Sequence, residues 1–307
     1  MGSILIPAMV AQGYDAGFSS ALSAISGSLG TVIPPSITFI IYGMITGESI
    51  GDLFLSGIVP GLIFGFMLCI MVFIKSKKNG WKGETQRASL KEIGRLFLDT
   101  IWGLLSPVIV LGGIYSGLFT PTEAAAVAVV YSLIVGIFIY KELRLAELKE
   151  TLFSTAKTTG MILLIIMNAG IFSWVLTQQG IAASLTEMAL ALTDNKYIML
   201  VIINIVFLCA GCVMDNTSAL YILVPIIMPI AKALDINMIQ LGVILVLNLS
   251  IGQVTPPVGP NLYVAADIGK VKFEEICRKM VPLLLMSLLA LLCITYIPAL
   301  SLCLIPS

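Results

Sequence analysis

Hydrophobic residues lie in long runs separated by short polar connections. A helix needs about 20 apolar residues to cross the roughly 30 Å hydrocarbon core of a bilayer. Three apolar regions are each interrupted by a short polar or proline-containing stretch: 16–46, 197–234 and 239–266. Five runs reach about the spanning length without interruption: 53–74, 101–119, 121–140, 158–176 and 281–303. The pattern predicts an all-α, polytopic membrane protein, a helical bundle in which the interruptions are the informative positions.

Basic residues indicate the orientation, because Lys and Arg beside membrane spans are retained on the cytoplasmic side. The segments rich in Lys and Arg are 75–95, 141–149 and 270–279. The segments 46–52, 177–197 and 235–238 together hold one lysine, and we expect them outside. The number of membrane crossings agrees with this orientation if the segment 197–234 enters and leaves the membrane on the same side.

We favour a re-entrant helical hairpin for 197–234. Two full spans with a turn at Asp215 give the same parity and stay open as an alternative. A hairpin turn would place the polar residues 215–218 at membrane depth, which is tolerated only where protein or a water-filled cavity surrounds them.

Two of the interrupted regions share an internal sequence repeat. The string "GTVIPP" at 30–35 matches "GQVTPP" at 252–257, and a serine precedes each at the same offset, Ser28 and Ser250. The loop charges predict that the first segment runs from inside to outside and the second from outside to inside. We therefore expect inverted repeats that are antiparallel in the membrane.

A Pro-Pro pair breaks a helix, because each ring removes a backbone donor and clashes with the preceding turn. Each repeat is thus predicted to be two half-helices joined by an unwound strip whose carbonyls lack intrahelical partners, unless the prolines merely kink the helix. Such carbonyls, with nearby hydroxyls, suit a bare cation, and half-helix N-termini favour an anionic substrate. We expect the cation near Gly30, Thr31, Ile33, Ser36, Asp215, Thr217, Gly252 and Thr255. We expect the substrate near Asn216, Ser218, Pro257, Gly259 and Asn261.

Composition agrees with a membrane protein and narrows its chemistry. Of 307 residues 58% are hydrophobic and 11% charged, and the mean hydropathy is +1.05. Histidine is absent, which removes imidazole bases and His-based metal sites. Seventeen basic residues balance seventeen acidic ones, so we expect no nucleic-acid partner. The six cysteines lie in or beside apolar runs and no P-loop motif occurs, so we expect no enzyme, no disulfide framework, no catalytic residues and no cofactor.

The predicted organisation is a single membrane domain over 1–307. Residues 1–74 would end a first repeat that contains the broken helix 16–46, and 75–100 would be a cytoplasmic basic linker. A second repeat, 101–307, would contain the hairpin 197–234 and the broken helix 239–266. In "TPTEAAAV" we expect Glu123 to cap a helix start.

Several strings resemble a known family. They include "GSILIPAMVAQGYD", "GTVIPPSITFIIYG", "GGIYSGLFTPTEAAAVAVVY" and "GQVTPPVGPNLYVA", and they are similar to the large membrane subunit of tripartite ATP-independent periplasmic (TRAP) transporters, the DctM type. The resemblance implies an ion-transporter-like carrier of the elevator type in a bacterial or archaeal cytoplasmic (inner) membrane. It further implies sodium as the coupling ion, and partnership with a small membrane subunit and with a periplasmic substrate-binding protein that delivers a C4-dicarboxylate, sugar acid or similar carboxylate.

The sequence departs from that family in one respect. In the family, "GSILIPAM" follows the Ser-Gly-Ser turn of a first hairpin, which this sequence lacks together with the preceding spans. We therefore expect either a fragment or a truncated reading frame, with the first cation site incomplete and the second complete. Two other functions stay open: a carboxylate carrier that needs no binding protein, and an ion channel, since broken helices also line pores. An intramembrane enzyme would depend on Asp215 and Asp267, which lie on opposite sides in the predicted topology.

Overall fold

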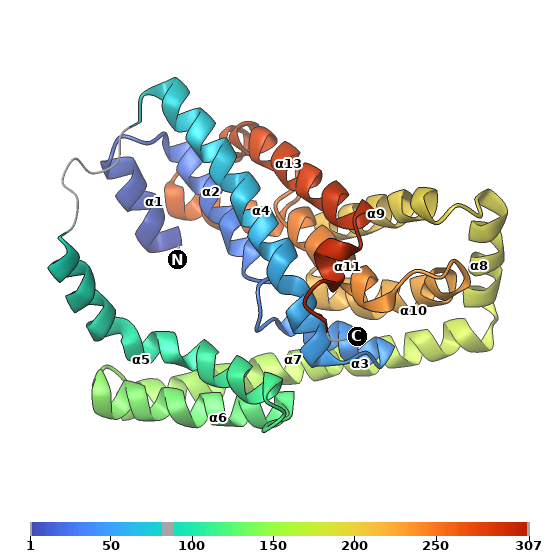
Figure 1. Ribbon diagram of the computed structural model, residues 1–307, viewed down its shortest axis with the longest axis horizontal. Helices are drawn as coiled ribbons and strands as arrows, with labels where there is room; N and C mark the ends of the chain where they lie inside the picture. The colour runs from blue at the N-terminus through green and yellow to red at the C-terminus, as the bar shows by residue number, and fades with distance from the viewer. Residues whose placement is uncertain (1, 82–88, 306–307) are drawn as a thin grey trace. The chain divides into compact units, whose positions relative to one another are not determined.

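The computed structural model describes residues 2–81 and 89–305, and its described regular elements are all helices (Figure 1). The first six are α1 (Gly2–Ala11), α2 (Ala16–Leu29), α3 (Ile37–Thr46), α4 (Ile50–Asn79), α5 (Leu90–Tyr115) and α6 (Pro121–Ile134). A π-helical turn, η1 (Val135–Ile139), leads to α7 (Leu145–Gln178) and α8 (Ile181–Leu192). The remaining ones are α9 (Lys196–Val213), α10 (Asn216–Ala233), α11 (Met238–Gly252), α12 (Pro260–Gly269), α13 (Phe273–Tyr296) and α14 (Ala299–Leu302).

Seven helices among the described residues are long and apolar enough to cross a membrane. Five of them overlap the five uninterrupted apolar runs, and the other two are α9 and α10, with 18 residues each. The prediction of an all-α polytopic membrane protein is thereby confirmed.

The chain divides into two compact units. Unit 1 consists of Met1–Glu84 together with Ala169–Ser307, and unit 2 is Thr85–Asn168. The predicted single membrane domain with two consecutive repeats stays a prediction. The broken helices of both repeats lie within unit 1 and pack on each other there, where α2 contacts α12 and α13, and α11 contacts α3 and α4.

The predicted linker 75–100 is largely helical where the structure describes it. The helix α4 continues to Asn79 before Gly80 ends it in a left-handed conformation, and α5 begins at Leu90. Lys77 and Lys78 lie in the last turn of α4, where cations interact favourably with the helix dipole. Part of the predicted linker, 82–88, lies outside the described residues.

Unit 2 contains an antiparallel pair formed by α5 and α6. The hydroxyl of Tyr131 donates to the carbonyl of Trp102 at 2.6 Å, and that of Tyr140 donates to the carbonyl of Asp99 at 3.0 Å. Helix α6 starts with a capping box in which Thr120 and Glu123 each bond to the other's backbone N–H. The expectation that Glu123 caps a helix start is confirmed.

Both Pro-Pro motifs interrupt their helices. α2 ends at Leu29 and α3 begins at Ile37, and in the second copy α11 ends at Gly252 and α12 begins at Pro260. A cis peptide joins the two prolines of each motif. We call 30–36 the first break and 253–259 the second break.

The two broken helices run antiparallel and lie side by side in unit 1. Contacts between them pair low residue numbers in one with high numbers in the other. A Cβ built on Gly269 would meet the hydroxyl of Ser20. Further along, Asn261 bonds to Ser28, Ser250 to Thr31, and Met238 to Tyr42. The antiparallel course that the loop charges predict is therefore present in the structure.

Contacts within unit 1 distinguish its two ends. At one end Lys279 forms a 3.0 Å ion pair with Asp15, and Trp81 packs 5.0 Å from the ring of Tyr14. These contacts bring the basic segments 75–81 and 270–279 together, and we call this end the basic end. At the opposite end the rings of Tyr197 and Tyr296 lie 5.9 Å apart.

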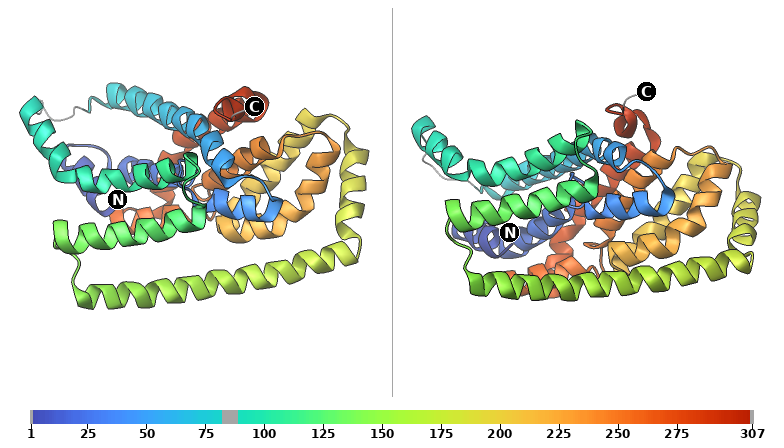
Figure 2. Two further views of the ribbon diagram at one scale, coloured as in Figure 1. Left: turned by 60° about the horizontal axis from the view of Figure 1, so that its bottom comes forward. Right: turned by 90° about the horizontal axis from the view of Figure 1, so that it is seen from below.

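Helices α9 and α10 are joined by a short turn, contact each other and form a hairpin (Figures 1 and 2). Their outer ends lie away from the basic end, because α9 begins next to Tyr296 and α10 leads directly into α11. The turn between them contacts the second break, where the N–H of Gly259 donates to the carbonyl of Cys212 at 3.3 Å. A turn beside a break midway along a helix is the arrangement of a re-entrant hairpin. Its depth in a bilayer stays a prediction.

Candidate functional site

The first break is held by hydroxyls. Ser36 caps α3, because its Oγ accepts from the N–H of Phe39 at 3.3 Å and donates to the carbonyl of Thr31 at 2.5 Å. The hydroxyl of Thr31 bonds to the carbonyl of Ser28 at 2.8 Å and pairs with the hydroxyl of Ser250 at 2.5 Å. Thr31 therefore links the first break to the end of α11.

The second break is held in a similar way. The hydroxyl of Thr255 donates to the carbonyl of Ile251 at 2.7 Å, which leaves the lone pairs of this oxygen for a ligand. The carbonyl of Gly252 accepts from the N–H of Thr255 at 2.9 Å. The carbonyl of Gln253 accepts from the N–H of Asn261 at 3.2 Å, which fixes the start of α12.

The carbonyls predicted to lack partners are therefore only partly free. Among residues 30–33 and 252–255, the carbonyls of Thr31, Gly252 and Gln253 accept hydrogen bonds from the chain. No donor among the described residues reaches the other five, which belong to Gly30, Val32, Ile33, Val254 and Thr255. Gly252 is thus less suited as a ligand than predicted, whereas Gly30, Ile33 and Thr255 keep an available oxygen.

Gln253 connects the second break to the hairpin turn. Its Nε2 donates to Oδ1 of Asn216 at 2.8 Å, and its Oε1 accepts from Nδ2 of Asn261 at 3.0 Å. Asn261 also donates to the hydroxyl of Ser28 at 3.2 Å. A continuous polar line, Asn216, Gln253, Asn261 and Ser28, therefore joins α10, the second break, α12 and α2.

Gln253 is a site residue that the sequence motifs alone did not identify. A signal was available, because Gln253 occupies the second position of the repeated motif, where the first copy has Thr31. Thr31 bonds to Ser250 of the opposite repeat, whereas Gln253 bonds to Asn216 and Asn261 of its own repeat.

Asp215 and Ser218 engage each other. Asp215 is the N-cap of α10, and its carboxylate accepts from the backbone N–H of Ser218 at 3.0 Å and from its hydroxyl at 2.6 Å. Asp is a preferred residue at this position. Within the described part of the chain Asp215 makes no hydrogen bond to the second break, and Thr217 makes no side-chain hydrogen bond. Asn216, buried with 7% exposure, is the turn residue that reaches the break.

Glycines allow the breaks to approach their neighbours. A Cβ on Gly57 of α4 would lie 2.8 Å from the carbonyl oxygen of Val32, and one on Gly252 would lie 2.6 Å from Cα of Gly211. Gly259 has φ of +47°, a left-handed conformation that glycine tolerates best. Gly57 and Gly211 were not selected from the sequence, whereas Gly259 was.

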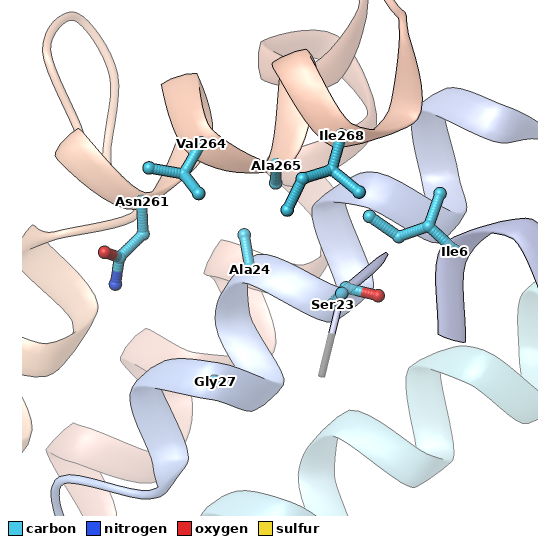
Figure 3. A pocket seen from close by; sticks show the side chains of 9 residues that line it. Ile6, Ser23, Ala24, Gly27, Asn261, Val264, Ala265 and Ile268 are labelled. Atoms are coloured by element: carbon cyan, nitrogen blue, oxygen red, sulfur yellow. The ribbon is translucent and has the colours of Figure 1, made fainter. Parts of the chain in front are cut away.

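A cavity of about 260 Å³ lies beside this line, between α1, α2 and α12 (Figure 3). Asn261 and Gly27 line it next to Ser28. Of the five predicted substrate residues, only Asn261 is among those that line the cavity. Pro257 and Gly259 belong to the second break, and Asn216 and Ser218 to the hairpin turn.

The arrangement defines a class of protein: a polytopic helical membrane protein with two antiparallel broken helices that meet at a partly buried polar site. Comparison with known proteins specifies the family. Residues 1–300 match the family model described as tripartite ATP-independent periplasmic transporter, DctM component, and the chain belongs to this family.

Three relatives illustrate the similarity. The chain is 42% identical over 97% of its length to an isethionate TRAP transporter permease protein DctMQ of Oleidesulfovibrio alaskensis. It is 42% identical over 99% of its length to a C4-dicarboxylate TRAP transporter large permease protein DctM of Pseudomonas aeruginosa. It is 36% identical over 98% of its length to a sialic acid TRAP transporter large permease protein SiaM of Vibrio cholerae. The chain spans 47%, 71% and 70% of these proteins respectively, so it corresponds to about half of the first.

Proposed function

We propose that this chain carries the ion and substrate site of a secondary active transporter, which takes up an organic acid together with a cation. The observation that carries the proposal is the pair of antiparallel broken helices whose breaks adjoin in unit 1, where Thr31 bonds to Ser250 and Asn261 bonds to Ser28. Five carbonyl oxygens there have no donor among the described residues. In hydrocarbon an unsatisfied carbonyl costs several kcal/mol, and a bound cation removes that cost.

The ligands favour a monovalent cation. Carbonyl and hydroxyl oxygens are neutral, and the described residues contain no cluster of three or more Asp, Glu, His or Cys that would suit a divalent metal. Helices α2 and α11 end at the breaks, so the negative ends of their dipoles point to the same region. We propose sodium as the coupling ion, with Thr255 as a ligand at the second break.

The relatives support an organic anion as substrate, because their names refer to isethionate, C4-dicarboxylates and sialic acid. The helices α3 and α12 begin at the breaks, and helix N-termini favour anions. We propose that the chain works in a bacterial or archaeal cytoplasmic (inner) membrane by an elevator movement. We further propose that a periplasmic binding protein delivers the acid and that a small membrane subunit is the second partner.

The test replaces Thr255. In proteoliposomes that contain this chain and the small subunit, with the binding protein outside, Thr255→Ala should weaken the sodium dependence of uptake by about tenfold or more, and Thr255→Ser should restore it. The matched control is Thr155→Ala, which removes the same type of hydroxyl-to-carbonyl bond, 2.7 Å to Thr151, from unit 2. An unchanged sodium dependence in Thr255→Ala would contradict the proposed cation site.

A direct measurement separates ion binding from transport. Sodium chloride, compared with choline chloride at equal ionic strength, should raise the melting temperature of the purified protein, because a ligand that binds only the folded state stabilises it. Flux that does not saturate with the acid and needs no binding protein would indicate a channel instead.

A further inference from the structure

The cavity beside the polar line has an unusual lining for an anion site. Of the nine residues that line it, only Ser23 and Asn261 have polar side chains, and none is charged. Ala24, Val264 and Ile268 contribute apolar surface (Figure 3). Its volume of about 260 Å³ corresponds to roughly nine water molecules, which is enough for a few carbon and oxygen atoms of a small solute.

The hydrogen bonds that Asn261 already makes determine whether its side chain can act as a donor or an acceptor for a ligand. An amide nitrogen has two hydrogens, and those of Asn261 are used by Oε1 of Gln253 at 3.0 Å and by Oγ of Ser28 at 3.2 Å. Its Oδ1 accepts no hydrogen bond from the described residues. Asn261 therefore presents an acceptor rather than a donor.

An acceptor repels a carboxylate or sulfonate. With no Lys or Arg in the lining, an anionic group in the cavity would lose its hydration without gaining a partner, which is unfavourable. A substrate hydroxyl fits instead, because it can donate to Oδ1 of Asn261 at one end of the cavity or exchange a hydrogen bond with the hydroxyl of Ser23 at the other (Figure 3). The apolar residues fit the carbon skeleton that bears such a hydroxyl.

We propose that this cavity binds the uncharged, hydroxylated part of the transported acid, and that the substrate is a hydroxylated organic anion. The inference rests on the proposed function and specifies its substrate class. The anionic end lies outside the cavity, towards the breaks, where a bound cation supplies positive potential.

The test compares pairs of anions that differ by one hydroxyl. Binding to the purified protein in sodium chloride is measured calorimetrically for malate against succinate and for isethionate against ethanesulfonate. We expect the hydroxylated member of at least one pair to bind about tenfold more tightly, which is the effect of one hydrogen bond in a buried site. If both members of each pair bind equally, the inference is wrong while the proposed function stands. If no anion binds with or without sodium, both fail.

A substitution in the cavity tests whether the cavity causes the preference for hydroxylated anions. Ser23→Ala should reduce the hydroxyl preference to about threefold or less and leave the affinity for the unhydroxylated member unchanged. The matched control is Ser26→Ala, which lies on the same helix three residues further and does not line this cavity. An undiminished preference in Ser23→Ala would overturn the assignment of the hydroxyl to this cavity.

Discussion

Gln253 shows how a single side chain can connect separate segments of the site. It bonds to Asn216 at the start of α10 and to Asn261 at the start of α12. Asn216 is nearly buried, so its amide oxygen depends on Gln253 for a donor. In a weakly hydrated interior such a bond matters mainly because its loss leaves an unpaired polar group.

The first prediction follows from this dependence. Gln253→Leu keeps most of the side-chain volume but removes both hydrogen bonds, so it should lower the free energy of unfolding by about 1–3 kcal/mol. The measurement is the melting temperature in detergent. The exposed Gln12 supplies the control, since Gln12→Leu should change stability by less than about 0.5 kcal/mol. Equal melting temperatures for the two variants would show that the polar line contributes nothing.

The hairpin turn shows what the sequence could predict at this scale. Its polar residues were identified because such residues within an apolar region need a polar surrounding. Which of them faces the break could not be predicted, because that depends on the rotation of α10. In the observed rotation of α10, Asp215 caps the helix and the side chain of its neighbour Asn216 faces inwards, towards Gln253.

At the scale of helices, glycine contacts set how closely α9 approaches α11. Gly211 and Gly252 face each other, and a Cβ on Gly252 would lie 2.6 Å from Cα and 2.7 Å from the carbonyl carbon of Gly211. Backbone atoms cannot move aside as a flexible side chain can. In membranes such small residues allow helices to pack at short distance.

Gly252→Ala should therefore separate α9 from the second break. We expect a loss of about 1–3 kcal/mol in stability, as for other overpacked interiors, and a weaker stabilisation by sodium. Gly160→Ala in α7 should have the opposite sign, because nothing lies within 4 Å of the added Cβ and alanine is the better helix former. Thermal unfolding with and without sodium measures both. A Gly252→Ala protein as stable as Gly160→Ala would contradict the close packing.

The limits of the broken helices were predictable, because proline and glycine act on their own backbone. The predicted regions 16–46 and 239–266 correspond closely to α2 with α3 and to α11 with α12. The division into two units was not predictable. It follows from packing between residues far apart in the sequence, such as Thr31 and Ser250, which no local pattern records.

At the scale of the whole chain, the contacts of unit 1 indicate which segments share a side of the membrane. Within unit 1 the ion pair of Asp15 with Lys279 and the packing of Trp81 on Phe18 place the end of α4 beside the start of α13. Lys232, at the end of α10, belongs to the opposite end, because the next helix begins beside Tyr42. The loop charges predict that the basic end faces the cytoplasm.

Three exposed lysines allow this sidedness to be measured. In a variant whose native cysteines are replaced, Lys78→Cys, Lys272→Cys and Lys232→Cys are introduced singly, and intact cells are treated with a membrane-impermeant maleimide. Lys232→Cys should react at once, whereas the other two should react only after permeabilisation, because the second broken helix crosses the membrane between Lys232 and Lys272. Reaction of Lys232→Cys and Lys272→Cys from the same side would mean that this helix does not cross. That result would contradict the proposed ion site. Two breaks can form one ion site at membrane depth only if both segments cross the bilayer in opposite directions.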